Sequence, residues 1–445
     1  MTMIVLAVAA CTSQENPSGG EPDVSQEKDA TNTADSSTTP DADVDLGPHP
    51  DLVEFSSEEV GFIIGPQVTL GTSLWPFFDE NMAAKAKEHR DAAVAAMTGT
   101  DGDAALNSTY YDLALSLYAL HARSSDPVHL EYARDVAAAW WESMPARVSW
   151  DKDNAFGISP RNASVGGLVL YAMEGGGTEE RTFDTWENTT VDYNLWGWLT
   201  DYARNHYFIW IERALDYPNL WFGVRDGAYT LLLMAHLAEV HPDEAVRAEF
   251  REKSLKAARD YYARLQHDDG GWYWDIDDEM GPVTAQPFMI GMLMEAMTAV
   301  HQLTADEAVG QAIVKAADWL WEKAYEQQET TNLAGVHWRA MKYFVFNDGR
   351  VYTRESAFEY GMEDGAIRDA RQLNSTSVHT FGYAFLITGD VKYRERGDDI
   401  FSASYGKGRG PGSDAYWGLA DFRTKEFNQS YRSGGRYLAW RLSHP

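Results

Sequence analysis

The chain has 445 residues and a formal net charge of −31 at pH 7, because 68 Asp and Glu outnumber 37 Lys and Arg. This excess of negative charge argues against binding to nucleic acid and against electrostatic docking on anionic lipid. Cys11 is the single cysteine. It leaves the rest of the chain without an intramolecular disulfide, a cysteine-based zinc site or a thiol nucleophile.

Residues 1–11 have the pattern of a lipoprotein-type signal. A short apolar run ends in Val8-Ala9-Ala10-Cys11, which resembles the lipobox of bacterial lipoproteins. The resemblance implies that Cys11 becomes the lipidated N-terminus after cleavage. It also implies a location in the bacterial cell envelope, anchored to the outer membrane or secreted. An apolar N-terminus without function is the alternative.

Residues 12–50 are rich in Ser, Thr, Asp, Glu, Pro and Gly and offer almost nothing to bury. Such a segment cannot offset the entropy lost on ordering, so we predict a disordered linker. The folded domain is then 55–445, because no second linker interrupts it. No later apolar run approaches about 18 residues, so no transmembrane helix is predicted.

Helical hairpins recur along this domain with a period of about 60 residues. Apolar helices that end near His121, His241 and His301 are each followed by a short polar turn and a second helix. Helix pairs of this size cannot bury their faces alone and must stack. Six of them predict an all-α fold, an (α/α)6 toroid, with an open helical solenoid as the alternative. The second helices are 129–141, 244–265 and 307–325, and a further pair spans 380–405 with Thr388-Gly389-Asp390 as its turn.

The stretch 265–304 is predicted as a helix end, a loop and a new helix from about Pro287. Gly270-Gly271 stops the first helix, because glycine tolerates a left-handed backbone. The sequence from Leu265 through Asp269-Gly-Gly-Trp-Tyr-Trp274 resembles the inter-helix loop of (α/α) toroid enzymes, among them six-hairpin glycosidases, polysaccharide lyases, sugar epimerases and terpenoid cyclases. We therefore expect a loop that binds carbohydrate, since aromatic faces stack on sugar rings. The expected substrate-binding residues here are Trp272, Trp274, Asp275 and Gln286.

A second candidate constellation lies between residues 371 and 383. Ser377 is a plausible N-cap, which would place His379 in the first helical turn and Tyr383 one turn later. With Arg371 and Asn374, these side chains suit β-elimination from a uronic acid. A cation or amide neutralises the carboxylate, His or Tyr removes the C5 proton, and Tyr protonates the leaving oxygen. Toroid polysaccharide lyases use similar sets. A structural role for His379 is the alternative.

Two further groups of residues are candidates. Asn205-His206, with Arg225 downstream, resembles a dipeptide of alginate-lyase-like toroids, and Asp226 to Tyr229 has the pattern of an inner-helix start. His206 and Tyr229 are then candidate catalytic residues, and Asn205 and Arg225 would bind substrate. The acidic residues around the Trp loop could form a glycosidase acid/base pair, hold calcium, or form a solvated turn. The tentative calcium ligands are Asp275, Asp277 and Asp278.

These patterns favour a surface-tethered polysaccharide lyase that cleaves a uronic-acid-containing, hence anionic, polysaccharide. Two alternatives stay open. One is a glycoside hydrolase on the same toroid that uses paired Asp residues. The other is a non-catalytic glycan-binding lipoprotein. No cofactor is required by any of the three, although calcium could take part, and none of them involves nucleic acid.

Overall fold

The computed structural model describes part of the chain. The described residues are 57–65, 76–99, 105, 108–148, 162–163, 165–184, 190–212, 224–273, 284–326, 330–331, 337–339, 341–347, 371–405 and 424–443. Contacts separate Met1–Ala42 from Asp43–Pro445, and the second unit is described below. The predicted lipidation site Cys11 and the predicted linker 12–50 lie outside the described residues, so both stay predictions.

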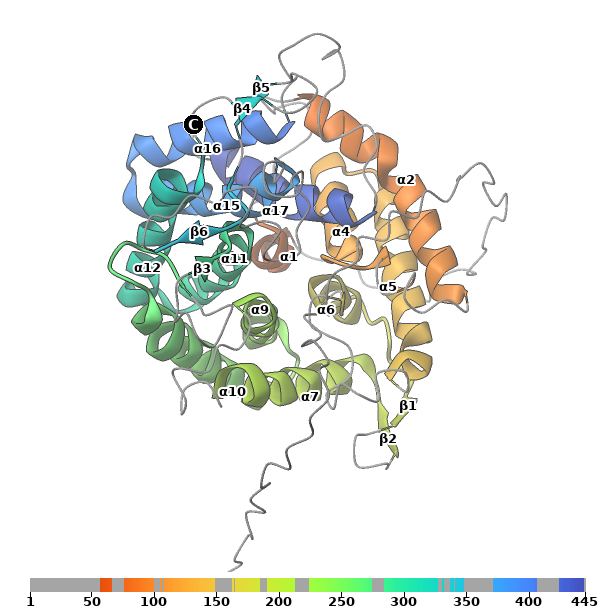
Figure 1. Cartoon of the computed structure of the whole chain (residues 1–445). Coiled ribbons are helices and arrows are strands. Elements are labelled where there is room, and N and C mark those ends of the chain that lie inside the picture. The colour runs from red at the N-terminus through yellow and green to blue at the C-terminus, as the bar shows by residue number, and fades with distance from the viewer. Residues whose placement is uncertain are drawn as a thin grey trace, which may run out of the picture. The chain divides into compact units, whose positions relative to one another are not determined.

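Six of the described helices form a closed inner ring (Figure 1). Each contacts the next in chain order, and the last contacts the first. That closure confirms the (α/α)6 toroid and excludes the open solenoid. The inner helices are α4 (Leu113–Ser124), α6 (Val165–Met173), α9 (Val224–Val240), α11 (Pro287–Thr304), α15 (Arg371–Thr388) and α17 (Thr424–Ser443).

A second layer of helices surrounds this ring (Figure 1). Three of the outer helices continue into π-helical segments, namely η2 (Phe208–Glu212), η3 (Ala257–Ala263) and η4 (Leu320–Ala324). Inner helices are apolar on nearly all sides because both the ring and the outer layer cover them. Outer helices bury one side only. The outer helices are α2 (Pro76–Thr98), α5 (Pro127–Val148), α7 (Leu195–Tyr207), α10 (Glu244–Lys256), α12 (Glu307–Trp319) and α16 (Val391–Tyr405).

Short turns join the inner to the outer helix in the hairpins α4–α5, α9–α10, α11–α12 and α15–α16, whereas α6 and α7 are joined by residues 174–194. In α11–α12 the turn residue Ala305 takes a left-handed conformation with φ of 52°, and in α15–α16 Gly389 does so with φ of 68°. The following residue is an aspartate in both turns. Asp306 caps α12 by accepting from the Val309 amide at 3.1 Å. Asp390 sits equivalently before α16, which confirms the predicted turn.

The connections that lead into the inner helices are longer, and all of them open at the other end of the ring. The longest, 325–370, precedes α15. We call this side the long-connection end and the opposite side the short-turn end. Short antiparallel strand pairs lie within the connections between helices (Figure 1). These pairs are β1 (Arg181–Asp184) with β2 (Thr190–Tyr193), β3 (Thr284–Ala285) with β6 (Val345–Phe346), and β4 (Thr330–Thr331) with β5 (His337–Trp338).

An additional helix, α1 (Ser57–Ile64), lies inside the ring (Figure 1). It contacts α4, α9 and α11. The ring of Phe62 meets the edge of His236 at a centroid distance of 6.1 Å. Arg436 of α17 donates a hydrogen bond to the carbonyl oxygen of Ile63. The chain therefore fills part of its own ring.

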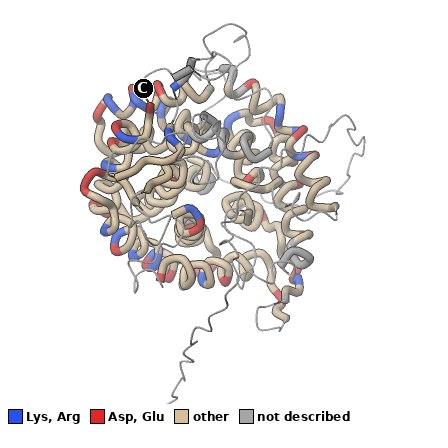
Figure 2. Tube along the Cα trace, in the orientation of Figure 1, with Lys and Arg blue, Asp and Glu red and all other residues tan. Residues whose placement is uncertain are grey.

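Charged residues gather on the outer helices, whereas the inner ring is largely uncharged (Figure 2). The few charged side chains that are buried within the ring are therefore candidates for a functional role. Among the described helices, none is long and apolar enough to cross a membrane.

Candidate functional site

Asp112 links the starts of two inner helices at the long-connection end. Its carboxylate accepts hydrogen bonds from the amides of Leu115 at 3.1 Å, Gly166 at 2.7 Å and Gly167 at 3.2 Å. Asp112 and the preceding Tyr111 both take left-handed conformations, with φ of 67° and 66°. Such backbone strain in residues other than glycine concentrates at functional sites.

The carboxyl of Asp112 is almost fully buried, with 1% of the residue exposed. Burial raises its pKa, although Arg432 and the three amides favour the charged form. A carboxyl with a raised pKa can hold a proton at a higher pH than an exposed aspartate can. Asp112 is thus a candidate general acid.

Two tyrosines precede Asp112, and one of them, Tyr110, connects the start of α4 to α9 and α17. Arg225, at the start of α9, donates from Nη1 to the hydroxyl of Tyr110 at 3.0 Å. Asn428, at the start of α17, donates from Nδ2 to the carbonyl of Tyr110 at 2.8 Å. Tyr111 packs edge-on against Tyr110 at 4.3 Å. The predicted substrate-binding residue Arg225 therefore does lie at the long-connection end.

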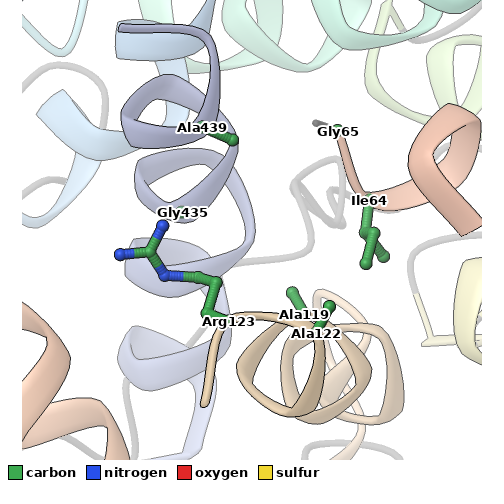
Figure 3. Close-up of a pocket in the computed structure, with 7 residues that line it drawn as sticks. All are labelled: Ile64, Gly65, Ala119, Ala122, Arg123, Gly435 and Ala439. Atoms are coloured by element: carbon green, nitrogen blue, oxygen red, sulfur yellow. The ribbon is translucent and has the colours of Figure 1, made fainter. Parts of the chain in front are cut away.

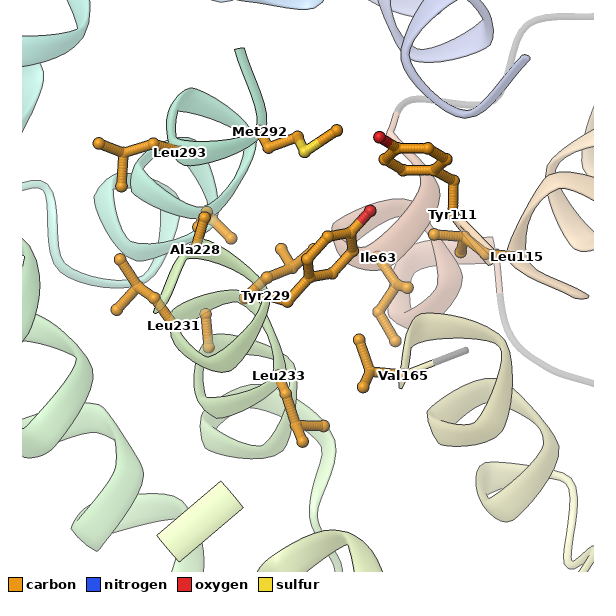
Figure 4. Close-up of a cluster of buried hydrophobic side chains, with 14 of the residues drawn as sticks. Ile63, Tyr111, Leu115, Val165, Ala228, Tyr229, Leu231, Leu233, Met292 and Leu293 are labelled. Atoms are coloured by element: carbon orange, nitrogen blue, oxygen red, sulfur yellow. The ribbon is translucent and has the colours of Figure 1, made fainter. Parts of the chain in front are cut away.

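Tyr229, a predicted catalytic residue, extends from α9 into the interior of the ring. In Figure 4 its side chain points towards Ile63 and Tyr111. It is 3% exposed, and its hydroxyl has no hydrogen-bond partner among the described residues. The guanidinium of Arg432 lies 4.8 Å from the ring centroid. Burial, with the nearby negative charges, raises the pKa of Tyr229, and Arg432 opposes this effect.

Glu295 of α11 carries the buried negative charge at the centre of the ring. Its Oε1 lies 3.0 Å from Nε of Arg432 and 3.3 Å from Nη2 of Arg436. Burial alone would raise the pKa of Glu295, but the two arginines and His379 lower it to about 2. Glu295 is therefore ionised at neutral pH. Asp112, Tyr229 and Glu295 each interact electrostatically with Arg432. We call these four residues the bore cluster.

The predicted role of Ser377 as an N-cap is wrong. Helix α15 already includes Arg371, so Ser377 lies inside it and donates instead to the carbonyl of Pro287 at 3.3 Å. His379 therefore does not lie in the first turn of the helix, where its imidazole would interact with the partial positive charge of the helix N-terminus. It is fully buried beside Glu295 and Arg436, and burial lowers its pKa to about 4. The side chain of Arg371 lies outside the described residues.

The other two members of that predicted constellation have structural partners. Tyr383 is 3% exposed, and its hydroxyl lies 2.7 Å from Nδ1 of His301 near the short-turn end. Asn374 is fully buried and holds a neighbouring connection. Its Oδ1 accepts from the amide of Met341 at 2.6 Å, and its Nδ2 donates to the carbonyl of Arg339 at 3.1 Å. The three described side chains, Asn374, His379 and Tyr383, do not converge on one pocket.

The Asn205-His206 pair belongs to the outer helix α7, not to the ring interior. Asn205 is exposed. His206 is 2% exposed, its Nδ1 lies 3.0 Å from the carbonyl of Tyr202, and burial lowers its pKa to about 4. Within the described part of the chain, neither side chain meets the bore cluster.

The predicted sugar-binding loop is only partly described. Trp272 is 5% exposed, and its Nε1 donates to the carbonyl of Tyr262 at 2.9 Å, so its ring has a packing role. Gln286 occupies the N-cap position of α11, is 8% exposed and makes no side-chain cap bond. Trp274, Asp275, Asp277 and Asp278 lie outside the described residues.

The predicted calcium site therefore stays a prediction. Asp269, from the same acidic segment, accepts hydrogen bonds from the Gly271 amide at 3.1 Å and from the Tyr273 hydroxyl at 2.6 Å. Within the described ranges, no group of three or more His, Cys, Asp or Glu side chains could hold a metal ion.

Asp112, Glu295 and Arg432 were not among the residues predicted from the sequence. Local signals for two of them exist. Glu295 is the single charged residue in the apolar helix α11, and Asp112 follows two tyrosines directly before an apolar helix. The pairing of Glu295 with Arg432 spans 137 positions and has no local signature.

No protein-family model and no curated protein matches this chain. Among solved structures, a similar one is the α-1,6-mannanase GH76A of Salegentibacter sp. HEL1_6, an inactive variant with two aspartates replaced by alanine, in complex with α-1,6-mannotetrose. The sequence identity is 12% and the TM-score is 0.47. The match covers 82% of this chain and 100% of the mannanase.

The prediction of a polysaccharide lyase is wrong. The geometry of the chain supplies the physical reason. Tyr383, the predicted proton donor, bonds to His301, and Asn374 is occupied by two backbone groups. Neither side chain is available to a uronate. A glycoside hydrolase and a non-catalytic glycan-binding lipoprotein are the two alternatives that remain from the sequence.

Proposed function

We propose that this protein is a carbohydrate-active enzyme that hydrolyses glycosidic bonds at the long-connection end of its toroid. The observation that carries the proposal is Asp112, a buried carboxyl with a raised pKa at the start of an inner helix. Glycosidases need one carboxyl that is protonated at the working pH, so that it can protonate the leaving oxygen. Asp112 would take this role.

Glu295 is unsuited to that role. Its Oε1 is held by both Arg432 and Arg436, and its pKa of about 2 keeps it ionised. It would instead fix the direction of Arg432, whose guanidinium contacts the Tyr229 ring. Two carboxyls with opposite pKa shifts therefore sit around one arginine, which is an arrangement typical of acid/base sites.

A glycosidase needs a second carboxylate as base or nucleophile. The connection 264–286 opens at the same end as Asp112. We propose that the second carboxylate is Asp275, Asp277 or Asp278 of that connection. The substrate would be a polysaccharide, and the tyrosines at this end would supply faces for its sugar rings.

Glycan binding without catalysis is a second candidate, and one observation favours it. Both carboxylate oxygens of Asp112 already accept hydrogen bonds from backbone amides. An aspartate with a purely structural role would make such bonds. A protein of this kind would bind glycans through the tyrosines at the long-connection end and would not hydrolyse them.

The test measures reducing ends released from a panel of neutral and acidic polysaccharides. Asp112→Asn should lower kcat about 10²- to 10⁴-fold, as loss of a general acid does, while glycan binding persists. Asp306→Asn is the matched control, because Asp306 caps α12 at the short-turn end, and it should keep full activity. Binding without release of reducing ends by the wild type would establish the capture protein instead. No unsaturated-uronate absorbance should accompany hydrolysis.

We also propose that the protein works at the cell envelope, anchored through Cys11. The proposal is supported by the lipobox-like Val8-Ala9-Ala10-Cys11 and by the linker composition of 12–50. Expression of the full chain should place it in the membrane fraction, and Cys11→Ser should release it. Unchanged partitioning of the Cys11→Ser protein would refute lipid anchoring.

A further inference from the structure

Helix α1 forms a floor inside the ring. Ile63 is fully buried, and its carbonyl accepts a hydrogen bond from Arg436. Gly65 follows with φ of +90°, and a Cβ at this position would lie 3.2 Å from Cγ of Arg436. The same Arg436 lies 3.3 Å from Glu295. The floor is therefore tied directly to the charged centre of the ring.

Little space remains beside this floor. The cavity between α1, α4 and α17 has a volume of about 10 Å³ (Figure 3). This is about the space that one water molecule needs, so no sugar ring can pass beside α1 here. The cavity is lined by Ile64, Gly65, Ala119, Ala122, Arg123, Gly435 and Ala439. Helix α1 also contacts α9 and α11, so it lies in the way of a molecule that enters from the long-connection end.

Two polar groups above the floor lack partners. The hydroxyl of Tyr229 and Nη1 of Arg432 are both buried, and neither makes a hydrogen bond within the described part of the chain. Tyr229 points towards Ile63 of the floor and towards Tyr111 (Figure 4). A tyrosine hydroxyl can donate or accept, and a guanidinium nitrogen donates. Together they suit the hydroxyl and ring oxygens of a sugar.

We infer that Tyr229 and Arg432 bind the terminal sugar of a glycan that enters the ring end first. An internal sugar has chain on both sides, and α1 lies where the chain beyond Tyr229 would have to pass. A terminal sugar has chain on one side only and fits a site with one entrance. The inference rests on the proposed glycosidase function and deepens it. The enzyme then acts on chain ends and releases short products.

The first experiment follows the digestion of each hydrolysed polysaccharide of the panel over time, with the full-length protein. Size-exclusion chromatography measures the mean polymer mass, and sugar analysis identifies the products. End-on binding predicts mono- or disaccharides from the earliest times, with a slow fall in polymer mass. A rapid fall in mass without short products would overturn end-on binding and leave the glycosidase function intact. No hydrolysis of any polysaccharide would overturn both.

The second experiment compares two Tyr→Phe variants on the same polysaccharide. Tyr229→Phe should lower kcat/KM about tenfold or more, the effect of losing one hydrogen bond that orients substrate. Tyr262→Phe is the control, because its hydroxyl is equally buried and unpartnered among the described residues but lies against Gly227, between η3 and α9. It should keep wild-type kcat/KM. Equal losses in both variants, or none in Tyr229→Phe, would overturn the assignment.

Discussion

Glu295 and Arg432 form an ion pair at the centre of the toroid, with Oε1 and Nε 3.0 Å apart and side chains 3% and 5% exposed. The pair joins α11 to α17, two helices that are not neighbours in the ring. A buried charge is tolerated only when it is paired and hydrogen-bonded. The ion pair thus holds α11 and α17 together across the ring. It also fixes the position of Arg432, whose guanidinium contacts the Tyr229 ring.

Glu295→Gln should destabilise the fold strongly. The substitution leaves Arg432 and Arg436 without their buried counter-charge, which typically costs about 3–5 kcal/mol. The free energy of unfolding, measured by urea denaturation, reports the loss. Glu249→Gln is the control, because Glu249 pairs with Arg204 on the outer surface, where such a bridge contributes about 0–1 kcal/mol. Similar losses of unfolding free energy in both variants would contradict the prediction that the buried ion pair matters more than the exposed one.

Stability should fall as the pH drops below about 6.5. Burial lowers the pKa of His236 to about 3 and that of His379 to about 4, so between about pH 6.5 and 4 the unfolded chain binds protons that the folded chain does not. Below the usual pKa of 4.5, Glu295 adds a loss that continues towards pH 2. Urea denaturation across pH 4–8 measures the slope, and His379→Leu should reduce it by up to about 1.4 kcal/mol per pH unit. An unchanged slope would argue against a neutral buried His379.

The fold could be predicted because the sequence pattern of its helical hairpins repeats along the chain. His121 and His301 mark equivalent positions in two hairpins, because the carbonyl of each accepts a hydrogen bond from the turn residue four positions later. The Gly389-Asp390 turn has the same form as Ala305-Asp306. Helix α1 was not predicted, because it is only eight residues long and its burial depends on a ring that forms around it.

The site was harder to predict, because its contacts join distant parts of the chain. The predictions relied on spacing within one helix, and this placed Ser377 at a helix start that lies at least six residues earlier. Asp112 and Gly166 are 54 positions apart, and Glu295 and Arg432 are 137 apart. Only the closed ring brings such residues together, since nothing in their local sequence specifies a partner.

Asn374→Ala should destabilise the protein without a direct effect on chemistry. The side chain bonds to the amide of Met341 and the carbonyl of Arg339, and buried backbone groups left unpaired cost about 1–3 kcal/mol. Hydrogen exchange should show faster opening of 339–347. Asn205→Ala, on the exposed side of α7, should have no measurable effect. If kcat of the Asn374→Ala protein fell about 100-fold or more while it remained folded, the catalytic role predicted from the sequence would be restored.

Tyr383→Phe should keep near-full activity. The hydroxyl bonds to His301 near the short-turn end, away from Asp112, so its loss should cost only about 0.5–1.5 kcal/mol of stability. Thermal unfolding and the reducing-end assay measure the two effects separately. Collapse of turnover with normal stability would contradict this placement of Tyr383 outside the active site.

Gly167→Ala tests the close approach of α6 to α4 that seats Asp112. A Cβ at Gly167 would lie 2.4 Å from Cβ of Ala114 and 2.8 Å from Oδ1 of Asp112. The two helices must separate to admit it, which should cost about 1–3 kcal/mol and pull the Gly167 amide from the carboxylate. Activity should fall with stability, because Asp112 loses its orientation. Gly435→Ala is the control, since a Cβ there meets nothing within 4 Å, and it should stabilise α17 by about 0.5–1 kcal/mol. A Gly167→Ala protein with unchanged stability and activity would show that the contact at Asp112 is looser than described.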